Sequence, residues 1–139
     1  MRAGACRAAV HLEGGRHHAH KSRAGGFCYA NDAVLAVLCL LGSFRRVLYV
    51  DIDIHHCDAV EEAFSLTDRV VTASLHKHAP GFFPGTGAAG AAGAGRGAGF
   101  GLNLPLADGV RDGTLVEAFR GLAGGAVRLA RPDAVVLQW

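Results

Sequence analysis

Apolar residues in this chain occur in runs whose length and spacing predict helices alternating with strands. Residues 31–44 form the longest run, with Asn31 or Asp32 as a candidate N-cap and Gly42 as a C-terminal stop. This segment is apolar around its whole circumference, which predicts a helix that is buried on every face.

Three shorter apolar runs predict strands because they are brief and rich in β-branched residues. They cover residues 46–54, 69–76 and 133–139. Each run is uniformly apolar, and helical segments separate one run from the next. The pattern therefore predicts an α/β fold, with a parallel sheet and helices on both of its faces.

Two more helices are predicted between these strands, each from a capping pattern. Residues 58–66 begin with Asp58 and Glu61 in the positions of a cap pair, and residues 114–117 form a second capping box. The second helix ends at the Arg-Pro of residues 131–132. Its apolar residues recur at helical spacing: Leu115, Phe119, Leu122, Ala126 and Leu129.

Residues 84–101 are almost entirely glycine and alanine, in a tract that follows the second predicted strand. Such a composition buries too little surface to fix one conformation, so it predicts a flexible surface loop. A phosphate-binding loop is disfavoured, because no Lys-Ser or Lys-Thr pair follows and no strand leads directly into the tract.

Composition limits the classes of protein to consider. The 139 residues are half hydrophobic and carry a net charge of +2, without the Lys/Arg block that direct nucleic-acid binding would require. The four cysteines form no C-x-x-C pair, which favours a reducing compartment. The chain shows no signal-peptide pattern and no apolar run long enough for a membrane span. We expect a protein of the nucleus, the cytoplasm or both.

The end of the first predicted strand carries the candidate chemistry. In an extended strand side chains alternate, so we expect Asp51, Asp53 and His55 to point to one face, at the C-terminal end of a parallel strand. Burying carboxylates is costly unless a positive group compensates, and this ligand set suits Zn²⁺ or a similar divalent ion. The alternatives are a solvated strand end with Asp58 capping a helix, and a phospho-acceptor acidic cluster, which His55-His56 disfavours.

A second candidate is the adjacent pair His17-His18. A pair of neighbouring histidines is more often a surface feature than a catalytic one, and successive side chains usually point apart. Beside the acidic strand, however, an imidazole oriented by a carboxylate could serve as the general base for a metal-bound water. Asp51 and Asp58 are then free to orient the two imidazoles.

Five segments together resemble the histone deacetylases, and the DIDIHH form is similar to the class I, zinc-dependent branch. The resemblance covers residues 14–138 in family order and rests on GGRHHAHK, GGFCYANDAVLAV, RVLYVDIDIHHCDAVEEAF, VVTASLHKHAPGFFPGTG and DAVVLQ. It implies an arginase–deacetylase fold and the hydrolysis of acetyl-lysine amides in histone tails and other proteins. It also implies corepressor proteins as partners and a role in chromatin regulation and transcription repression.

The resemblance assigns roles to residues of the metal and proton-transfer sites. Asp53 and His55 match two of three zinc ligands. His17 matches a histidine paired with Asp51, and His18 matches a histidine paired with Asp58. In the family the histidine at the position of His18 is the usual general acid/base.

Two further sites come from the resemblance alone. Gly26, Phe27 and Phe83 match the walls of the channel that holds the acetyl-lysine stem. A structural monovalent cation, K⁺ or Na⁺, is implied by five residues that act largely through backbone oxygens: Asp51, Asp53, His55, Ser74 and Leu75.

The chain also departs from the family pattern. Arg16 stands where an apolar residue is usual, Cys57 and Ala59 occupy glycine positions, and Phe100 replaces a tyrosine. If the glycines provide positive φ or close packing, each added Cβ costs on the order of 1 kcal/mol or more. The Gly/Ala tract replaces a segment that is normally polar and charged.

Family members are much longer than this chain. The opening strands and the acidic loop that grips substrate would precede Met1, while the third zinc ligand and a carbonyl-polarising tyrosine would follow Trp139. We therefore expect residues 1–139 to be the central part of one histone deacetylase domain, truncated at both ends and inactive alone. The alternatives are a non-catalytic, partner-binding remnant and a deacetylase of small molecules such as acetylpolyamines.

Overall fold

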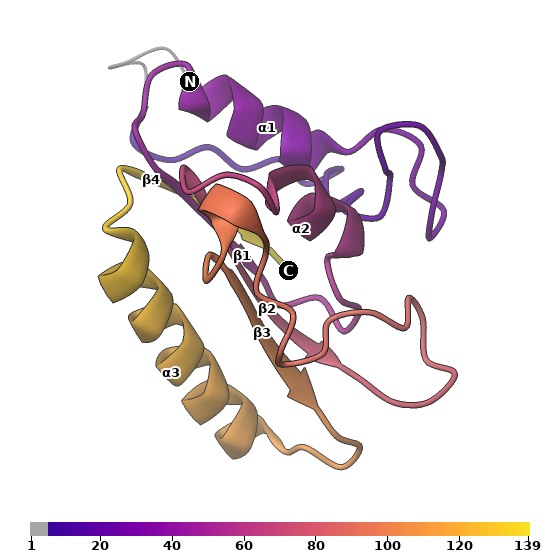
Figure 1. Cartoon of the computed structure of the whole chain (residues 1–139). Coiled ribbons are helices and arrows are strands. Elements are labelled where there is room, and N and C mark those ends of the chain that lie inside the picture. The colour runs from indigo at the N-terminus through magenta and orange to yellow at the C-terminus, as the bar shows by residue number, and fades with distance from the viewer. Residues whose placement is uncertain (1–5) are drawn as a thin grey trace.

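Four parallel strands form a sheet at the centre of the structure, a computed structural model that describes residues 6–139 (Figure 1). The strands are β1 (Val47–Asp51), β2 (Val70–Lys77), β3 (Gly101–Leu106) and β4 (Ala134–Gln138), and they lie in the order β3-β2-β1-β4. The three strands predicted from the sequence are β1, β2 and β4. The parallel sheet is confirmed.

The register brings the C-terminal ends of the central strands together. Asp51, the last residue of β1, is aligned with Ser74 of β2 on one side and with Gln138 of β4 on the other. Side chains that follow β1 therefore emerge at the carboxyl edge of the sheet, where open α/β proteins place their binding sites.

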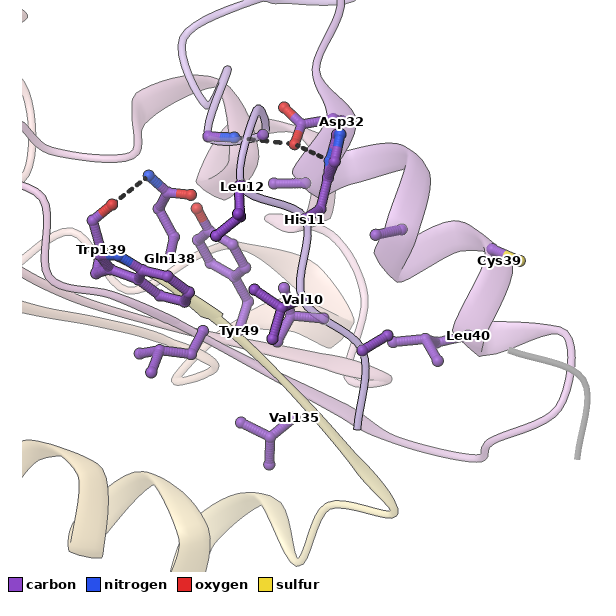
Figure 2. Close-up of a pocket in the computed structure, with 17 residues that line it drawn as sticks. Val10, His11, Leu12, Asp32, Cys39, Leu40, Tyr49, Val135, Gln138 and Trp139 are labelled. Atoms are coloured by element: carbon purple, nitrogen blue, oxygen red, sulfur yellow. Dashed lines mark hydrogen bonds and ion pairs between the residues drawn. The ribbon is translucent and has the colours of Figure 1, made fainter. Parts of the chain in front are cut away.

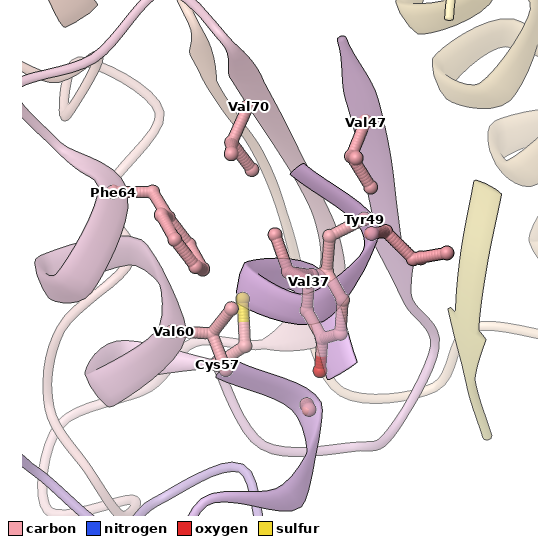
Figure 3. Packing of buried hydrophobic residues seen from close by; sticks show 9 residues of the cluster. Val37, Val47, Tyr49, Cys57, Val60, Phe64 and Val70 are labelled. Atoms are coloured by element: carbon pink, nitrogen blue, oxygen red, sulfur yellow. The ribbon is translucent and has the colours of Figure 1, made fainter. Parts of the chain in front are cut away.

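The first face of the sheet is covered by α1 (Asp32–Leu41) and α2 (Asp58–Phe64) (Figure 1). Between these helices and the strands lies one apolar cluster, most of which Figure 3 labels. Its buried members are Ala33, Val37, Leu40, Val47, Tyr49, Cys57, Val60, Phe64 and Val70.

The second face is covered by α3 (Asp112–Ala130), which lies on the other side of the sheet in Figure 1. Alternate residues of β1 and β2 point to this face, as the two-residue period of a strand requires. The buried members of this second cluster are Leu48, Val50, Val71, Ala73, Ala126 and Ala130. Helices thus cover both faces, and the predicted three-layer α/β fold is confirmed.

Helix α1 has the predicted ends but not the predicted burial. The Asn31 side chain accepts a hydrogen bond from the Val34 amide at 2.9 Å, and Gly42 follows the last helical residue. Leu35 and Leu38 are nevertheless 60% and 53% exposed. The prediction of burial on every face is wrong, because the sheet lies on one side of the helix only.

Both predicted capping pairs are wrong. Helix α2 begins at Asp58, and its N-cap is Cys57, which makes no side-chain capping bond. The Asp58 carboxylate is bound to His18 instead of capping the helix. Helix α3 begins at Asp112, so Thr114 lies inside the helix. The predicted end of α3 is confirmed, since Arg131 follows Ala130 in the left-handed conformation.

Strand β3 was not predicted. It directly follows the Gly/Ala tract and contains Pro105, and both features weaken a strand signal. It pairs only with β2, at the edge of the sheet, where a residue without an N–H is tolerated.

The Gly/Ala tract is a loop, as predicted, with one 3₁₀ turn (Gly95–Gly97). Its contacts with α2 were not predicted: the Ala94 amide donates to the Ser65 carbonyl at 2.8 Å, and a Cβ added at Gly97 would overlap that same oxygen. Its flexibility stays a prediction. None of the helices within residues 6–139 is both long and apolar enough to cross a membrane.

Candidate active site

The chain after β1 does not continue as an extended strand. Instead, the Asp53 amide donates to Asp51 Oδ1 at 3.0 Å and the His55 amide donates to Asp53 Oδ1 at 2.7 Å. These side-chain-to-backbone bonds compete with strand pairing and turn the chain. Strand β1 ends at Asp51, so Asp53 and His55 do not belong to it. The predicted cause of their proximity to Asp51, the alternation of side chains along one strand, is therefore wrong.

Asp53 and His55 nevertheless meet as expected for two ligands of one ion. Their Oδ1 and Nδ1 atoms are 2.9 Å apart, and the side chains are 31% and 37% exposed. Burial by itself raises the pKa of Asp53, but the hydrogen bonds from the His55 backbone and ring outweigh it, so the pKa lies below its usual value. The carboxylate is ionised at neutral pH.

His17 and Asp51 form the more deeply buried histidine–carboxylate pair. Nδ1 of His17 is 2.8 Å from Asp51 Oδ2, which also accepts a short hydrogen bond from the Tyr49 hydroxyl. Nε2 of His17 lies 3.8 Å from Asp53 Oδ1. Burial lowers the pKa of His17, but the hydrogen bond to Asp51 and the charges of nearby carboxylates raise it above its usual value.

His18 pairs with Asp58, the first residue of α2, at 2.8 Å between Nδ1 and Oδ1. Burial raises the pKa of Asp58, but the bond from His18 and the amide of Ala59 lower it below its usual value overall. The His17 and His18 rings are 3.9 Å apart, so these sequence neighbours do not point apart. Asn31 holds their loop by donating from Nδ2 to the carbonyls of His17 and Ala19.

Phenylalanine rings flank His18 and His55. Phe83 packs edge-on to His18, with ring centroids 4.8 Å apart, and Phe82 stacks on His55 at 5.2 Å. Gly26 has φ +48°, and a Cβ there would lie 2.5 Å from Cδ2 of His18. Phe27 has φ +63° and is 96% exposed, so its ring projects from the surface beside this site.

Phe82 and Tyr49 are the site residues that the sequence analysis missed. Phe82 immediately precedes Phe83, which the resemblance assigns to the channel wall, and nothing in the sequence distinguishes the two neighbours. Tyr49 sits inside an apolar strand, two residues before Asp51 on the same face, and that spacing is a usable signal.

The arrangement offers a metal ion two side-chain ligands rather than three. Within residues 6–139, no group of three or more His, Cys, Asp or Glu side chains is placed to hold a metal ion. Ser74, one of the residues assigned to a monovalent cation, is aligned with Asp51 in the sheet, and Leu75 follows it in β2. That cation site stays a prediction.

The departures at glycine positions cause no backbone strain. Cys57 has φ −77°, and Ala59 is helical, so neither needs the left-handed conformation. Both side chains are buried, and Cys57 packs among apolar neighbours of the first cluster (Figure 3). Burial raises the pKa of the Cys57 thiol well above its usual value, which leaves it protonated and unreactive.

A cavity of about 430 Å³ lies beside the site, between residues 9–15, α1 and β4 (Figure 2). The Tyr49 ring lines it, and the Tyr49 hydroxyl holds Asp51. Neither histidine pair lines this cavity, so it is not the place where the candidate chemistry occurs.

A family model described as "Histone deacetylase domain" matches residues 1–139. Histone deacetylase 8 of Xenopus tropicalis is 50% identical over 138 residues, which are 99% of this chain and 37% of that protein. Histone deacetylase B of Dictyostelium discoideum is 51% identical over 130 residues, which are 94% of this chain and 31% of that protein.

Among solved structures, the crystal structure of an HDAC homolog from Aquifex aeolicus superimposes with a TM-score of 0.85 at 40% identity. The match covers 89% of this chain and 34% of that one. The sheet and its helices are therefore part of the predicted arginase–deacetylase fold. The chain spans about a third of the length of the relatives that it matches.

Proposed function

This chain belongs to the histone deacetylase family, and on that premise we propose that it forms the central part of a zinc-dependent deacetylase domain. The reaction is hydrolysis of acetyl-lysine amides in histones and other proteins. The observation that carries the proposal is the convergence of two histidine–carboxylate pairs, His17–Asp51 and His18–Asp58, beside Asp53 and His55.

Asp53 and His55 are the residues that would hold zinc. One carboxylate and one imidazole with facing ligand atoms fit this borderline cation, and the lowered pKa of Asp53 keeps its oxygens available. When bound, zinc supplies a Lewis acid that polarises an amide carbonyl and acidifies water.

His18 is the proposed general acid/base. Its Nδ1 donates to Asp58, so Nε2 carries the lone pair and can take a proton from the attacking water. The same proton then goes to the departing lysine nitrogen. Against the effect of burial, the bond from His17 to Asp51 raises the pKa of His17 and so favours its protonated form, which would stabilise negative charge that develops in the reaction.

Phe82, Phe83 and Gly26 are proposed to line the path of the substrate. The aromatic rings flank His55 and His18, and a glycine at position 26 leaves room against the His18 ring. Flat aromatic surfaces suit the aliphatic stem of acetyl-lysine. Phe27 extends this wall at the surface.

A structural K⁺ or Na⁺ is proposed for the backbone around Asp51, Asp53, His55, Ser74 and Leu75. Support comes from the parallel register, which aligns Asp51, the last residue of β1, with Ser74 inside β2. The same proposal includes acetylated histones as substrates and corepressor proteins as partners. It also includes a location in the nucleus or the cytoplasm.

A second candidate function concerns residues 1–139 taken alone. A catalytic zinc site usually has three protein ligands, whereas the described residues provide a pair. This observation favours a non-catalytic role for the isolated chain. Activity would then require another ligand from outside these residues.

The test is hydrolysis of an acetyl-lysine peptide by the whole protein that carries this chain, with and without a chelator, followed by added zinc. We expect chelation to abolish turnover and zinc to restore it. His18→Ala should lower turnover roughly 10²- to 10⁴-fold, because a general base is lost. The control His11→Ala changes a mostly exposed side chain and should have little effect. Turnover that persists unchanged in chelator would disprove the zinc mechanism.

A further inference from the structure

His20 lies on the opposite side of Asp58 from His18. Its Nε2 is 3.4 Å from Asp58 Oδ2, and its Nδ1 is 2.6 Å from Glu62 Oε2. The His20 amide donates to the Arg23 carbonyl at 3.0 Å, which fixes the backbone that carries the ring. A line of side chains therefore runs Glu62, His20, Asp58, His18.

Burial along this line makes the position of His20 significant. Its side chain is only 6% exposed, whereas Glu62 at the outer end is 66% exposed. Nε2 of His20 is buried without a hydrogen bond at the present separation. Native proteins rarely leave buried polar atoms unpaired, and here the nearest carboxylate oxygen belongs to Asp58.

We propose that His20 is a positioning residue for the His18–Asp58 pair, and that Glu62 in turn orients the His20 ring. This inference rests on the proposed function of that pair. His20 restrains the second oxygen of Asp58 while His18 binds the first. It touches no reacting atom and is not itself a catalytic residue.

The physical reason is the rotational freedom of a carboxylate. A carboxylate held through one oxygen can turn about its Cβ–Cγ bond, and His18 would then lose the acceptor that keeps its proton on Nδ1. A contact at the second oxygen removes this freedom, and contacts at active sites often tighten when substrate binds. Consistent with an interaction, the charge of His20 is among the causes that lower the pKa of Asp58, after burial, which raises it, and the bond from His18.

Other charged groups lie close by and must be considered in any pH measurement. A cavity of about 410 Å³ is lined by His20 and Asp58 together with Arg23, Glu61 and His56. A change in a pH profile alone could come from any of these groups. The tautomer of His18 is a more specific readout, because it depends directly on the Asp58 oxygen that His18 faces.

The experiment compares His20→Ala, His20→Gln and Glu62→Gln with the control His11→Ala in the whole zinc-loaded protein. We expect His20→Ala to lower kcat about 10- to 100-fold with KM unchanged, as is usual for a group that orients a functional side chain. His20→Gln keeps an N–H donor and should recover part of this loss. Glu62→Gln should cause a smaller loss, because the ring keeps its contact with Asp58.

The second readout is ¹⁵N NMR of the histidine rings, which does not require turnover. His18 should be protonated on Nδ1 in the unaltered protein, and a mixture of tautomers should appear in His20→Ala. A folded His20→Ala or His20→Gln protein with unchanged kcat and an unchanged His18 tautomer would overturn the proposal. If the unaltered protein hydrolyses no acetyl-lysine peptide, the proposed function fails, while the tautomer still decides the role of His20.

Discussion

At the scale of single residues, the buried charges of this protein are stabilised by hydrogen bonds from chain neighbours and from distant loops. Asp51 is fully buried and accepts bonds from His17, from the Tyr49 hydroxyl and from the Asp53 amide. A buried carboxylate without such donors would cost several kcal/mol, so the loop that carries His17 is coupled to the end of β1.

These pairs predict a pH dependence of stability for the metal-free protein. The pKa of His17 is raised on folding, so its contribution is fully present below about pH 6.5 and is lost as pH rises through the higher folded value. The pKa of Asp58 is lowered, so its contribution is present above about pH 4 and is lost as pH falls through the lower folded value. Urea unfolding should show the highest midpoint between these limits.

The control for this prediction is His17→Gln, which removes the titrating group. Its stability should fall less than that of the unaltered protein as the pH rises from about 6.5 to 8. Equal slopes for the two proteins would show that another group causes the alkaline loss.

At the scale of elements, the Gly/Ala tract is a loop that depends on glycine at particular positions. Ala94 and Gly97 lie against the end of α2, and Asn103 of β3 donates to the Ala91 carbonyl at 3.0 Å. The absence of a side chain at Gly97 lets the loop backbone approach the end of the helix. The tract thereby connects β2 to β3 across the end of α2.

Gly97→Ala should destabilise the protein by roughly 1–3 kcal/mol, because the new Cβ overlaps the Ser65 carbonyl and neither backbone can yield cheaply. Gly90→Ala is the matched control, since no heavy atom lies within 4 Å of a Cβ there. Thermal melting of the two variants checks this. A Gly97→Ala protein as stable as the control would mean that the tract does not pack on α2 in solution.

At the scale of the whole molecule, the sheet has exposed apolar side chains along one edge strand. The exposed side chains Val135, Leu137 and Trp139 lie along β4, at the edge of the sheet. Strand β4 runs parallel to β1, and the Ile52 amide donates to the Gln138 carbonyl at 3.0 Å, so the end of β4 lies beside the turn that leads to Asp53 and His55. A further ligand placed there would complete the proposed zinc site.

We therefore expect residues 1–139 alone to bind zinc weakly and to hydrolyse no acetyl-lysine peptide. Two ligands leave both affinity and water acidity below those of a three-ligand site. Competition with a chromogenic chelator measures the affinity, and Asp53→Asn should weaken whatever binding remains. One zinc retained per chain after dialysis, together with turnover, would contradict this prediction.

The fold was predictable because its pattern is local. Short β-branched runs and the Asn31 cap depend on neighbouring residues only, and β1, β2, β4 and α1 followed from them. Strand β3 was missed because a proline and a glycine tract weaken the local signal, although an edge position tolerates both. The cap predicted for α2 was wrong because the Asp58 carboxylate is bound by His18, a partner 40 residues away in the sequence.

The candidate site, like the fold, was predictable in part. Residue types and spacing, together with the family resemblance, were enough to select His17, His18, Asp51, Asp53, His55 and Asp58. They could not show that β1 stops at Asp51, since the turn depends on side-chain bonds that compete with strand pairing.

The sequence by itself determined the α/β class, the family and the identity of the metal-ligating and proton-transferring candidates, because these depend on periodicity and on the order of motifs along the chain. Only the tertiary structure decided which atoms meet: Tyr49 with Asp51, Phe82 with His55, and His20 with Asp58. The physical reason is that hydrogen bonds and ring contacts act over a few ångströms in space. Separation along the chain does not give these distances in space, because the register of the strands sets them.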